Sequence, residues 1–553
     1  MICSILITVD AKVTRPLPQA VLTFSIFKSD QVTRPDSSTS AFLRSVLYWF
    51  PPAVLALVLA LIYLNPFIGD WDGLDYTVAS LRGEPSSMAL GRSVFTLFNH
   101  GLYVTAHHLF GIRPDQAYLI FKFAVVAQVP LAIIMCWILA RDLTASRRSA
   151  TVAALLVAAS PILVTYGGQV MTDVPSVFVS AAALVVHLRG VQTRRVWLLL
   201  AGAVLLGLGV NLRETVGFYL PWLAIAPFLA GWKFDRRTVA LVGLSILLFF
   251  VVAFGIFAIW FALDAGYRAN WHIWLDSTRN EAARHPIQPA NLKPFVIFFF
   301  LAAPLVCIAL PVAFWRELRR RGWTLLLLAA SVGLFADALL FFNYSTTINW
   351  RYFLTGLPAL APLAGDYFVR SQTEKLRSAR LGFITAIAGV AAVAVAMGVL
   401  FQPRSNEYLN RLALAKDYSE TLKLIPPDAV VIAGAQTVAV TYWRGIGAGK
   451  WDHIGVGAGF PAGRLQKKIE EHLSAGRRVF LDIDPRWWQP CSWQQVEIRE
   501  LAAIEPHFHF RRVAPTVFEI RPVTDPSAKD EPNLPALLPE NRTEEVKKCF
   551  SAS

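Results

Sequence analysis

Three carboxylates lie within six residues of one another in a strongly hydrophobic sequence. Asp70, Asp72 and Asp75 stand in NPFIGDWDGLDYTVAS, residues 65–80, directly after the first long apolar run. A carboxylate can accept a proton as a general base, and neighbouring carboxylates can bind a divalent metal ion. A turn exposed to water also favours acidic residues. The stretch alone therefore leaves a chemical site and a solvated loop open.

A further acid and several bases border the other apolar runs. Asp173 precedes the run in MTDVPSVF, where it could act in a site or as an N-cap of a helix. Lys122 and Arg351 lie near the starts of runs, and Arg213 lies between two. Ionisable groups at membrane depth cost roughly 2.5–3.5 kcal/mol each on insertion scales, so they usually pair or mark a functional cavity. Snorkelling of Lys122 and Arg351, and a local pair of Arg213 with Glu214, are the alternatives.

Composition predicts that these residues belong to an integral membrane protein. Of the 553 residues, 55% are hydrophobic and 16% are charged, whereas soluble domains carry about 25% charged residues. The net charge of +14 would suit a nucleic-acid partner, but the basic residues fall in short clusters between apolar runs. Membrane topology requires such clusters. We therefore expect membrane lipid, and no nucleic acid, among the partners.

Eleven apolar runs are candidates for transmembrane helices, because about 30 Å of hydrocarbon requires roughly 17–25 residues. The fifth and sixth are separated only by NLRE and could form one kinked or re-entrant unit. The runs lie at about residues 43–65, 117–140, 149–166, 174–189, 196–211, 214–231, 238–263, 294–315, 323–343, 351–369 and 381–402.

The charges of the loops predict the topology. Strongly basic loops such as RDLTASRRS and RELRRRG alternate with acidic, neutral or mixed ones, and the positive-inside rule makes the basic set cytoplasmic. Residues 1–42 then form a cytoplasmic tail, while the first external loop, 66–116, and everything after residue 402 lie outside. The expected location is a plasma membrane, crossed many times.

After residue 402 the apolar runs shorten to strand length, which predicts an extracytoplasmic α/β domain over residues 403–525. A tail rich in Pro, Glu, Lys and Asn, residues 526–553, is expected to be disordered. The predicted strands are AVVIAG (429–434), RRVFLDID (477–484) and TVFEIRP (516–522), and a helix is predicted at 462–476.

Three motifs carry a family resemblance: DWDGLDY in the first external loop, MTDVPSVF at the fourth span and RYFLTGLPALAPLAG late in the membrane region. Through them the chain resembles GT-C-fold glycosyltransferases of the bacterial type related to protein O-mannosyltransferases and lipid A aminoarabinose transferases. The resemblance covers roughly residues 43–402 and implies a GT-C-type polytopic α-helical membrane domain of about eleven transmembrane helices.

The resemblance also implies roles for single residues. Asp72 matches the family's catalytic carboxylate, because Tyr76 follows it at the spacing D-x-x-x-Y. The family often has a second acid directly after that Asp, where this chain has Gly73. Asp70 could take its place, so either Asp70 or Asp72 could be the base. Asp173 matches the acid of the fourth-span motif.

The implied enzyme is an inverting glycosyltransferase that uses a polyprenyl-phosphate sugar outside the membrane. A carboxylate would take the proton of the acceptor hydroxyl, which is typically worth about 10²–10⁴-fold. Cations, or a divalent metal such as Mg²⁺ or Mn²⁺, would stabilise the leaving lipid phosphate. The sugar and the protein, lipid or glycan acceptor stay open. The assigned residues are the catalytic Asp70, Asp72 and Asp173, the phosphate-binding Arg351, Arg213 and Lys122, the substrate-binding Asp75, Tyr76 and Tyr352, and the metal ligands Asp70 and Asp72.

Two other classes of protein remain as alternatives. A transporter or channel would be expected to show repeated halves with Gly- or Pro-interrupted spans, and we find no internal repeat in the sequence. A non-enzymatic membrane protein with a ligand-binding external domain would tolerate loss of the acidic loop, whereas an enzyme would require one of its Asp residues.

Overall fold

The computed structural model describes most of the chain, and the fold below refers to those residues. Asp70, residues 1–37 of the predicted tail and the whole predicted C-terminal tail lie outside them. The described residues are 38–65, 67–68, 71–87, 89–269, 271–272, 275, 279, 289–343, 350–376, 381, 383–393, 395–396, 420, 422–434, 437–447, 449–457, 460–483 and 495–524.

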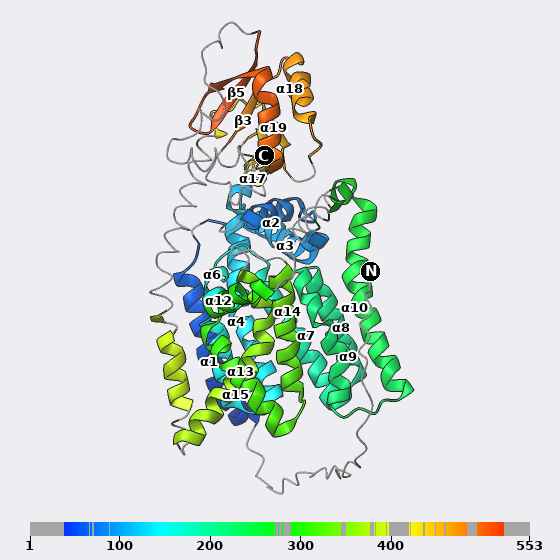
Figure 1. Ribbon diagram of the computed structural model, residues 1–553, viewed down its shortest axis with the longest axis vertical. Coiled ribbons are helices and arrows are strands. Elements are labelled where there is room, and N and C mark those ends of the chain that lie inside the picture. The colour runs from blue at the N-terminus through cyan, green and yellow to red at the C-terminus, as the bar shows by residue number, and fades with distance from the viewer. Residues whose placement is uncertain are drawn as a thin grey trace. The chain divides into compact units, whose positions relative to one another are not determined.

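Helices form at the predicted apolar runs, so the chain is a mostly helical, multi-span membrane protein (Figure 1). In the described part, four segments are long and apolar enough to cross a membrane: Ser45–Ile62, Pro114–Thr144, Asp173–Thr193 and Arg236–Leu263. The count of eleven spans stays a prediction. The helices are α1 Ser38–Ile62, α4 Ala117–Thr144, α5 Arg147–Ala158, α6 Pro161–Tyr166, α7 Asp173–Thr193, α8 Val196–Val210, α9 Leu220–Leu229, α10 Arg236–Leu263, α12 Leu292–Ala302, α13 Pro304–Arg321, α14 Leu325–Asn343 and α15 Phe353–Leu376.

Proline interrupts two of the predicted runs. The run at 149–166 divides into α5 and α6 at Pro161, and the run at 294–315 divides into α12 and α13 at Pro304. A proline supplies no backbone N–H to a continuing helix, so it is tolerated in the first turn of a new one. The second break bends the chain by 116°, and the pair α12–α13 gives a fifth candidate span if it is counted as one.

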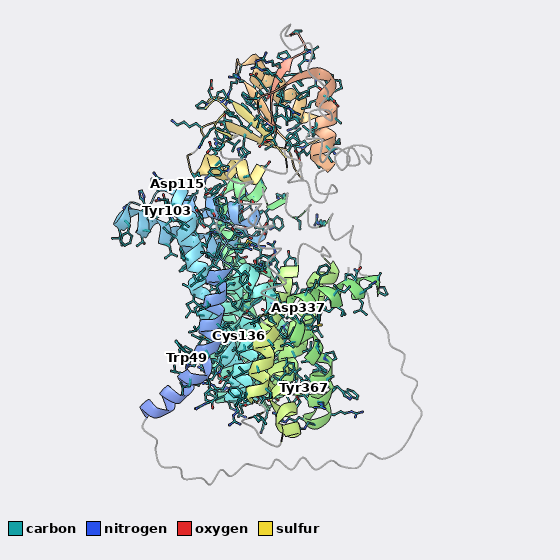
Figure 2. The ribbon with its side chains drawn as sticks, turned by 90° about the vertical axis from the view of Figure 1, so that its left-hand side faces the viewer. Trp49, Tyr103, Asp115, Cys136, Asp337 and Tyr367 are labelled. Atoms are coloured by element: carbon teal, nitrogen blue, oxygen red, sulfur yellow. The ribbon has the colours of Figure 1, made fainter. Side chains whose placement is uncertain are left out.

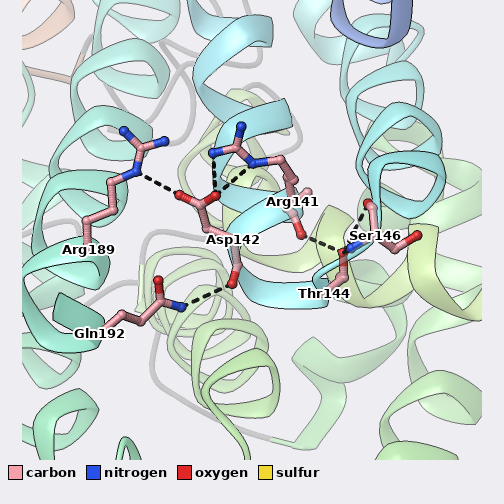
Figure 3. A network of polar contacts seen from close by, with 7 residues as sticks. Arg141, Asp142, Thr144, Ser146, Arg189 and Gln192 are labelled. Atoms are coloured by element: carbon pink, nitrogen blue, oxygen red, sulfur yellow. Dashed lines mark hydrogen bonds and ion pairs between the residues drawn. The ribbon is translucent and has the colours of Figure 1, made fainter. Parts of the chain in front are cut away.

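Figure 1 shows the helices packed side by side, α7 with α8 and α14 with α15. A charged network at one end of the bundle ties α4 to α7 (Figure 3). Asp142 accepts hydrogen bonds from Arg141 Nε at 2.8 Å and from Arg189 Nε at 2.9 Å, and its carbonyl accepts one from Gln192 at 3.2 Å. Arg141 and Asp142 belong to a basic loop that we predicted to be cytoplasmic.

The predicted first external loop, residues 66–116, is largely helical in its described part. It contains α2 Trp71–Arg82, the 3₁₀ turn η1 Ala89–Arg92, α3 Ser93–Phe110 and the 3₁₀ turn η2 Pro114–Gln116. In Figure 2 Asp115 and Tyr103 of this loop lie at the opposite end of the helices from Tyr367 of α15. The acidic motif therefore starts a short helix, α2, rather than forming an irregular turn.

The C-terminal region contains a five-stranded mixed sheet, ordered β2-β1-β3-β5-β4. β1 is parallel to β2 and β3, while β5 is antiparallel to β3 and β4. The predicted strands and helix are confirmed as β1, β3, β5 and α18. The sequence did not reveal β2, in which only Ile454 is buried, because it has no apolar run. The elements are β1 Val430–Ala433, α17 Thr437–Gly445, β2 Asp452–Gly455, α18 Arg464–Ser474, β3 Val479–Asp482, α19 Gln495–Ile504, β4 Phe508–Arg512 and β5 Val517–Pro522.

Candidate active site

Backbone hydrogen bonds join the segment before α2 to the segment before α7. The backbone N–H of Asn65 donates to the carbonyl of Gly168 at 3.2 Å, and that of Val170 donates to the carbonyl of Ile68 at 3.1 Å. Gly73 fits directly against this pairing, since a Cβ on it would lie 2.8 Å from the Val170 carbonyl oxygen. The position where the family often has a second acid thus has no room for a side chain.

Asp72, in the first turn of α2, pairs with Arg351 from the turn η5 (Trp350–Tyr352). Its Oδ2 accepts a hydrogen bond from Arg351 Nη2 at 2.7 Å, and the two side chains are only 15% and 11% exposed. Burial by itself would raise the pKa of Asp72, but the guanidinium groups of Arg351, Arg92 and Arg213 hold it below its ordinary value. Asp72 is therefore a carboxylate at neutral pH.

Asp173 and Arg213 form a second pair, which is completely buried. Their side chains are 0% and 1% exposed, and the guanidinium of Arg213 forms an ion pair with Asp173 Oδ1. Asp173 is the first residue of α7 and not the residue before it, which is Thr172. The carboxylate thus faces Arg213 across the bundle, and the alternative of a local pair between Arg213 and Glu214 is wrong.

Tyr352 contacts both arginines. The guanidinium carbon of Arg213 lies 5.1 Å from the centre of its ring, and that of Arg351 lies 5.9 Å from it. Both distances are within the range of cation–π attraction. The structure therefore brings Asp72, Asp173, Arg213, Arg351 and Tyr352, all predicted from the sequence, into one cluster.

The start of α15 fixes the turn that carries Arg351. Asp337 of α14 accepts a hydrogen bond from the backbone N–H of Gly356 at 2.8 Å. Tyr219 Oη donates to the carbonyl of Thr355 at 2.6 Å, and Thr355 Oγ1 donates to Thr215 Oγ1 at 3.0 Å. Because η5 leads directly into α15, these buried bonds limit how far the turn can move.

Arg92 is a member of the cluster that the sequence did not reveal. Its Nη1 donates to Tyr76 Oη and, at 3.1 Å, to Thr172 Oγ1, while its Nη2 pairs with Glu214 Oε1 at 3.0 Å. Its backbone is left-handed, with φ 44° and ψ 39°, which is unfavourable for a residue with a side chain and requires support from its surroundings. Arg92 joins α2, the start of α7 and η3 (Glu214–Tyr219).

Asp75 and Tyr76 face different neighbours. Asp75 accepts hydrogen bonds from the backbone N–H of Ser87 at 3.1 Å and from its hydroxyl at 2.8 Å. Burial raises the pKa of Asp75 to about 6 against the lowering effect of Ser87, and the charge of Asp72 adds to the rise. Burial also raises the pKa of Tyr76 well above its usual value, so Tyr76 is a neutral phenol. Their predicted contact with substrate stays a prediction.

Lys122 contacts the segment before α2 and an aromatic ring of its own helix, α4. Its Nζ donates to the carbonyl oxygen of Asn65 and lies 5.1 Å from the centre of the Tyr118 ring. The residue is 1% exposed, so it does not snorkel to water. It holds the start of the predicted first external loop, and its predicted contact with a phosphate remains a prediction.

The described residues do not fit a divalent metal ion. No group of three or more His, Cys, Asp or Glu side chains in that part of the chain is arranged to hold one. Asp72 already pairs with Arg351, and the guanidinium groups of Arg92 and Arg213 add positive charge around it. Asp70, the other predicted ligand, lies outside the described residues. We therefore derive no step of the chemistry from a metal.

Comparisons with known proteins agree with the resemblance. Residues 105–263 match the family model described as dolichyl-phosphate-mannose-protein mannosyltransferase. No curated protein matches the chain. The crystal structure of ArnT from Cupriavidus metallidurans bound to undecaprenyl phosphate is similar, with a TM-score of 0.54 at 16% identity, over 88% of this chain and 99% of that one.

An oligosaccharyltransferase from Archaeoglobus fulgidus is also similar. Its complex with Zn and sulfate has a TM-score of 0.50 at 14% identity, over 86% of this chain and 73% of that one. Its complex with an inhibitory peptide and a dolichol-phosphate has the same TM-score at 12% identity, over 90% of this chain and 76% of that one. The resemblance to GT-C-fold glycosyltransferases is thus confirmed, and the chain has an ArnT-like GT-C fold.

Proposed function

We propose that this protein is an inverting glycosyltransferase that moves a sugar from a polyprenyl-phosphate-linked donor to an acceptor hydroxyl. The observation that carries the proposal is the ionised Asp72 in contact with Arg351, beside the buried Asp173–Arg213 pair. The lipid phosphates in the similar structures, undecaprenyl phosphate in ArnT and dolichol-phosphate in the archaeal enzyme, support a donor of this class.

In the proposed reaction Asp72 is the general base. The acceptor oxygen attacks the anomeric carbon from the face opposite the phosphate, and the bond between that carbon and the phosphate oxygen breaks. The acceptor proton passes to the carboxylate, and the bonding electrons leave with the lipid phosphate. Attack from the opposite face inverts the anomeric centre. Asp70 remains the alternative base.

In this proposal Arg351 interacts with both the base, Asp72, and the leaving phosphate. A carboxylate held below its ordinary pKa by a guanidinium is a weak base. As the leaving phosphate gains negative charge, it competes with Asp72 for Arg351. The guanidinium then stabilises the leaving group, and the carboxylate becomes more basic as the proton arrives. Arg213 adds positive charge nearby, and Asp173 orients it.

The remaining assignments extend the proposal to the rest of the chain. Lys122 is proposed as a further phosphate ligand, and Asp75, Tyr76 and Tyr352 are proposed as substrate contacts. The site would face the extracytoplasmic side of a bacterial inner membrane, together with the domain over residues 403–525. The acceptor would be a protein, a lipid or a glycan, and the sugar a hexose or a pentose.

Transfer from a panel of polyprenyl-phosphate sugars tests this proposal, with the purified full chain in liposomes and mass spectrometry of donor and product. Asp72→Asn should abolish transfer with the parent's best donor, as Asp70→Asn would if that residue were the base. Asp115→Asn is the matched control, because Asp115 lies in the same external loop, 45% exposed and paired with Arg113. Full activity of both Asp72→Asn and Asp70→Asn would overturn the assignment.

A further inference from the structure

One helix of the C-terminal domain packs on the helix that carries Asp72. In sequence, α17 connects strands β1 and β2, so it is part of the C-terminal domain. Its buried residues Val440 and Tyr442 nevertheless belong to the same apolar cluster as Tyr76 and Val78 of α2. At its end, a Cβ on Gly445 would lie 3.2 Å from both methyl groups of Val78. The two helices are therefore in direct contact.

The two faces of the sheet belong to different apolar clusters. Val430 and Ile432 of β1 lie in a cluster with residues of α18 and α19. Val431 and Ala433, which alternate with them, lie in the cluster that contains α17 and α2. Because alternate residues of a strand point to opposite faces, one face of the sheet packs within its own domain and the other is continuous with the external loop.

Aromatic rings hold the segment before α2 against α17. The ring of Phe67 is stacked on Trp443, with centres 6.3 Å apart and planes at 10°. It meets Tyr442 edge-on at 5.7 Å and Tyr118 at 5.1 Å. Such offset and edge-on arrangements are the favourable ones for aromatic pairs. We call Phe67, Tyr118, Tyr442 and Trp443 the aromatic clasp.

The aromatic clasp restrains the chain segment that precedes α2 and Asp72. Phe67 donates its backbone N–H to Asn65 Oδ1 at 2.9 Å, and the following carbonyl of Ile68 accepts the bond from Val170. The segment is thus held by α17 through side chains and by the loop before α7 through its backbone. Since α2 has only 12 residues, and isolated helices shorter than about 12–15 residues are marginal in water, its position depends on such packing.

We propose that the C-terminal domain positions the catalytic carboxylate: Tyr442 and Trp443 of α17 hold α2 so that Asp72 meets Arg351. The inference rests on the proposed function for its consequence in catalysis, but the contact itself can be tested separately. Tyr442 and Trp443 are positioning residues, since their rings contact Phe67 and they act on Asp72 through α2.

Hydrogen–deuterium exchange of the full chain in liposomes tests the contact without any substrate. Trp443→Ala should speed exchange in peptides that cover α2, while peptides of β1 and β3 keep the parent's rates. Trp443→Phe, which keeps a ring for Phe67, should restore slow exchange. The matched control is Phe460→Ala, because Phe460 packs against the other apolar cluster of the same domain. Unchanged exchange of α2 in Trp443→Ala and Tyr442→Ala would overturn the inference.

Kinetics then test whether this packing positions the Asp72 carboxylate. Displacing a catalytic group by about 1 Å can cost about 10²-fold, so we expect kcat of Trp443→Ala to fall by about 10–100-fold with the KM for the donor nearly unchanged. Trp443→Phe should recover most of kcat, and Phe460→Ala should resemble the parent. Faster exchange of α2 with unchanged kcat would refute the positioning role. A parent that transfers no sugar would instead refute the proposed function and leave the exchange result valid.

Discussion

The buried pair of Asp173 and Arg213 gives the sharpest quantitative prediction. Both side chains are excluded from solvent, so removing one partner leaves an uncompensated charge, which typically costs about 3–5 kcal/mol. Asp173→Asn keeps the contact of Arg213 with the Tyr352 ring at 5.1 Å, and we expect a loss of about 3 kcal/mol in the free energy of unfolding. Arg213→Gln also loses that contact, which is worth about 0.5–2 kcal/mol. It should therefore be the more damaging change.

A double-mutant cycle measures this coupling. Denaturant unfolding in mixed micelles would give the free energy of unfolding for the parent, both single variants and the double variant. Because the double variant buries no lone charge, it should be more stable than the sum of the single losses predicts, by about 1–3 kcal/mol. Single losses that simply add would refute the idea of a buried, mutually neutralising pair.

The same double variant separates structure from catalysis. If the pair only supports the fold, recovery of stability should restore sugar transfer. If Arg213 stabilises the leaving phosphate, the double variant should be stable and still inactive. Asp142→Asn is a suitable comparison, because Asp142 pairs with two arginines at the other end of the bundle and is 10% exposed. It should lower stability without a selective loss of kcat.

Three further predictions follow from the site. Gly73→Ala should destabilise the protein by about 1–3 kcal/mol, measured by unfolding, because the new Cβ would lie 2.8 Å from the Val170 carbonyl oxygen; parental stability would contradict this close approach. The pKa of Asp75 is raised from 3.8 to about 6 in the folded protein. The folded state therefore binds the proton more tightly than the unfolded state, and the stability gained from this proton is complete below about pH 4 and is lost as the pH rises through about 6. The melting temperature of the parent should thus fall relative to Asp75→Asn between about pH 4 and pH 6.5, and a constant difference would argue against a raised pKa. Transfer should continue in excess chelator within about twofold of the untreated rate, because guanidinium groups surround Asp72; loss of transfer restored by Mg²⁺ or Mn²⁺ would show that a metal is required.

Hydropathy predicted the elements of the fold well where one long apolar run makes one helix. It predicted α4, α7 and α10 closely, and it failed at Pro161 and Pro304, where a single run becomes two helices. Length and hydropathy cannot show whether such a run crosses the membrane or bends within it. In the C-terminal region the buried strands β1, β3 and β5 were predictable from their apolar runs, whereas the half-exposed β2 was not.

The site was predictable only where a charge interrupts an apolar pattern. Asp173, Arg213 and Arg351 stand out because a charge beside a span requires an explanation. Arg92 does not stand out, because it lies in a polar loop where an arginine is ordinary. The Arg92 guanidinium contacts residues 76, 172 and 214. Only the tertiary fold brings residues so far apart in the sequence together, so the sequence did not reveal these contacts.

In the proposed reaction, the exposure of the three guanidinium groups indicates which ion pair opens for the donor. Among the described residues Arg92 pairs with Glu214, Arg213 with Asp173 and Arg351 with Asp72. A lipid phosphate that binds one of these guanidinium groups would compete with the acid that the group already contacts. Arg213 and Arg92 are 1% and 6% exposed, whereas Arg351 is 11% exposed and its partner 15%. Glu214, the partner of Arg92, is the most exposed of the three acids at 29%, but Arg351 is the most exposed of the guanidinium groups, and the phosphate must reach a guanidinium. We therefore expect the Arg351–Asp72 pair to open, and the acid thus released, Asp72, is the proposed base.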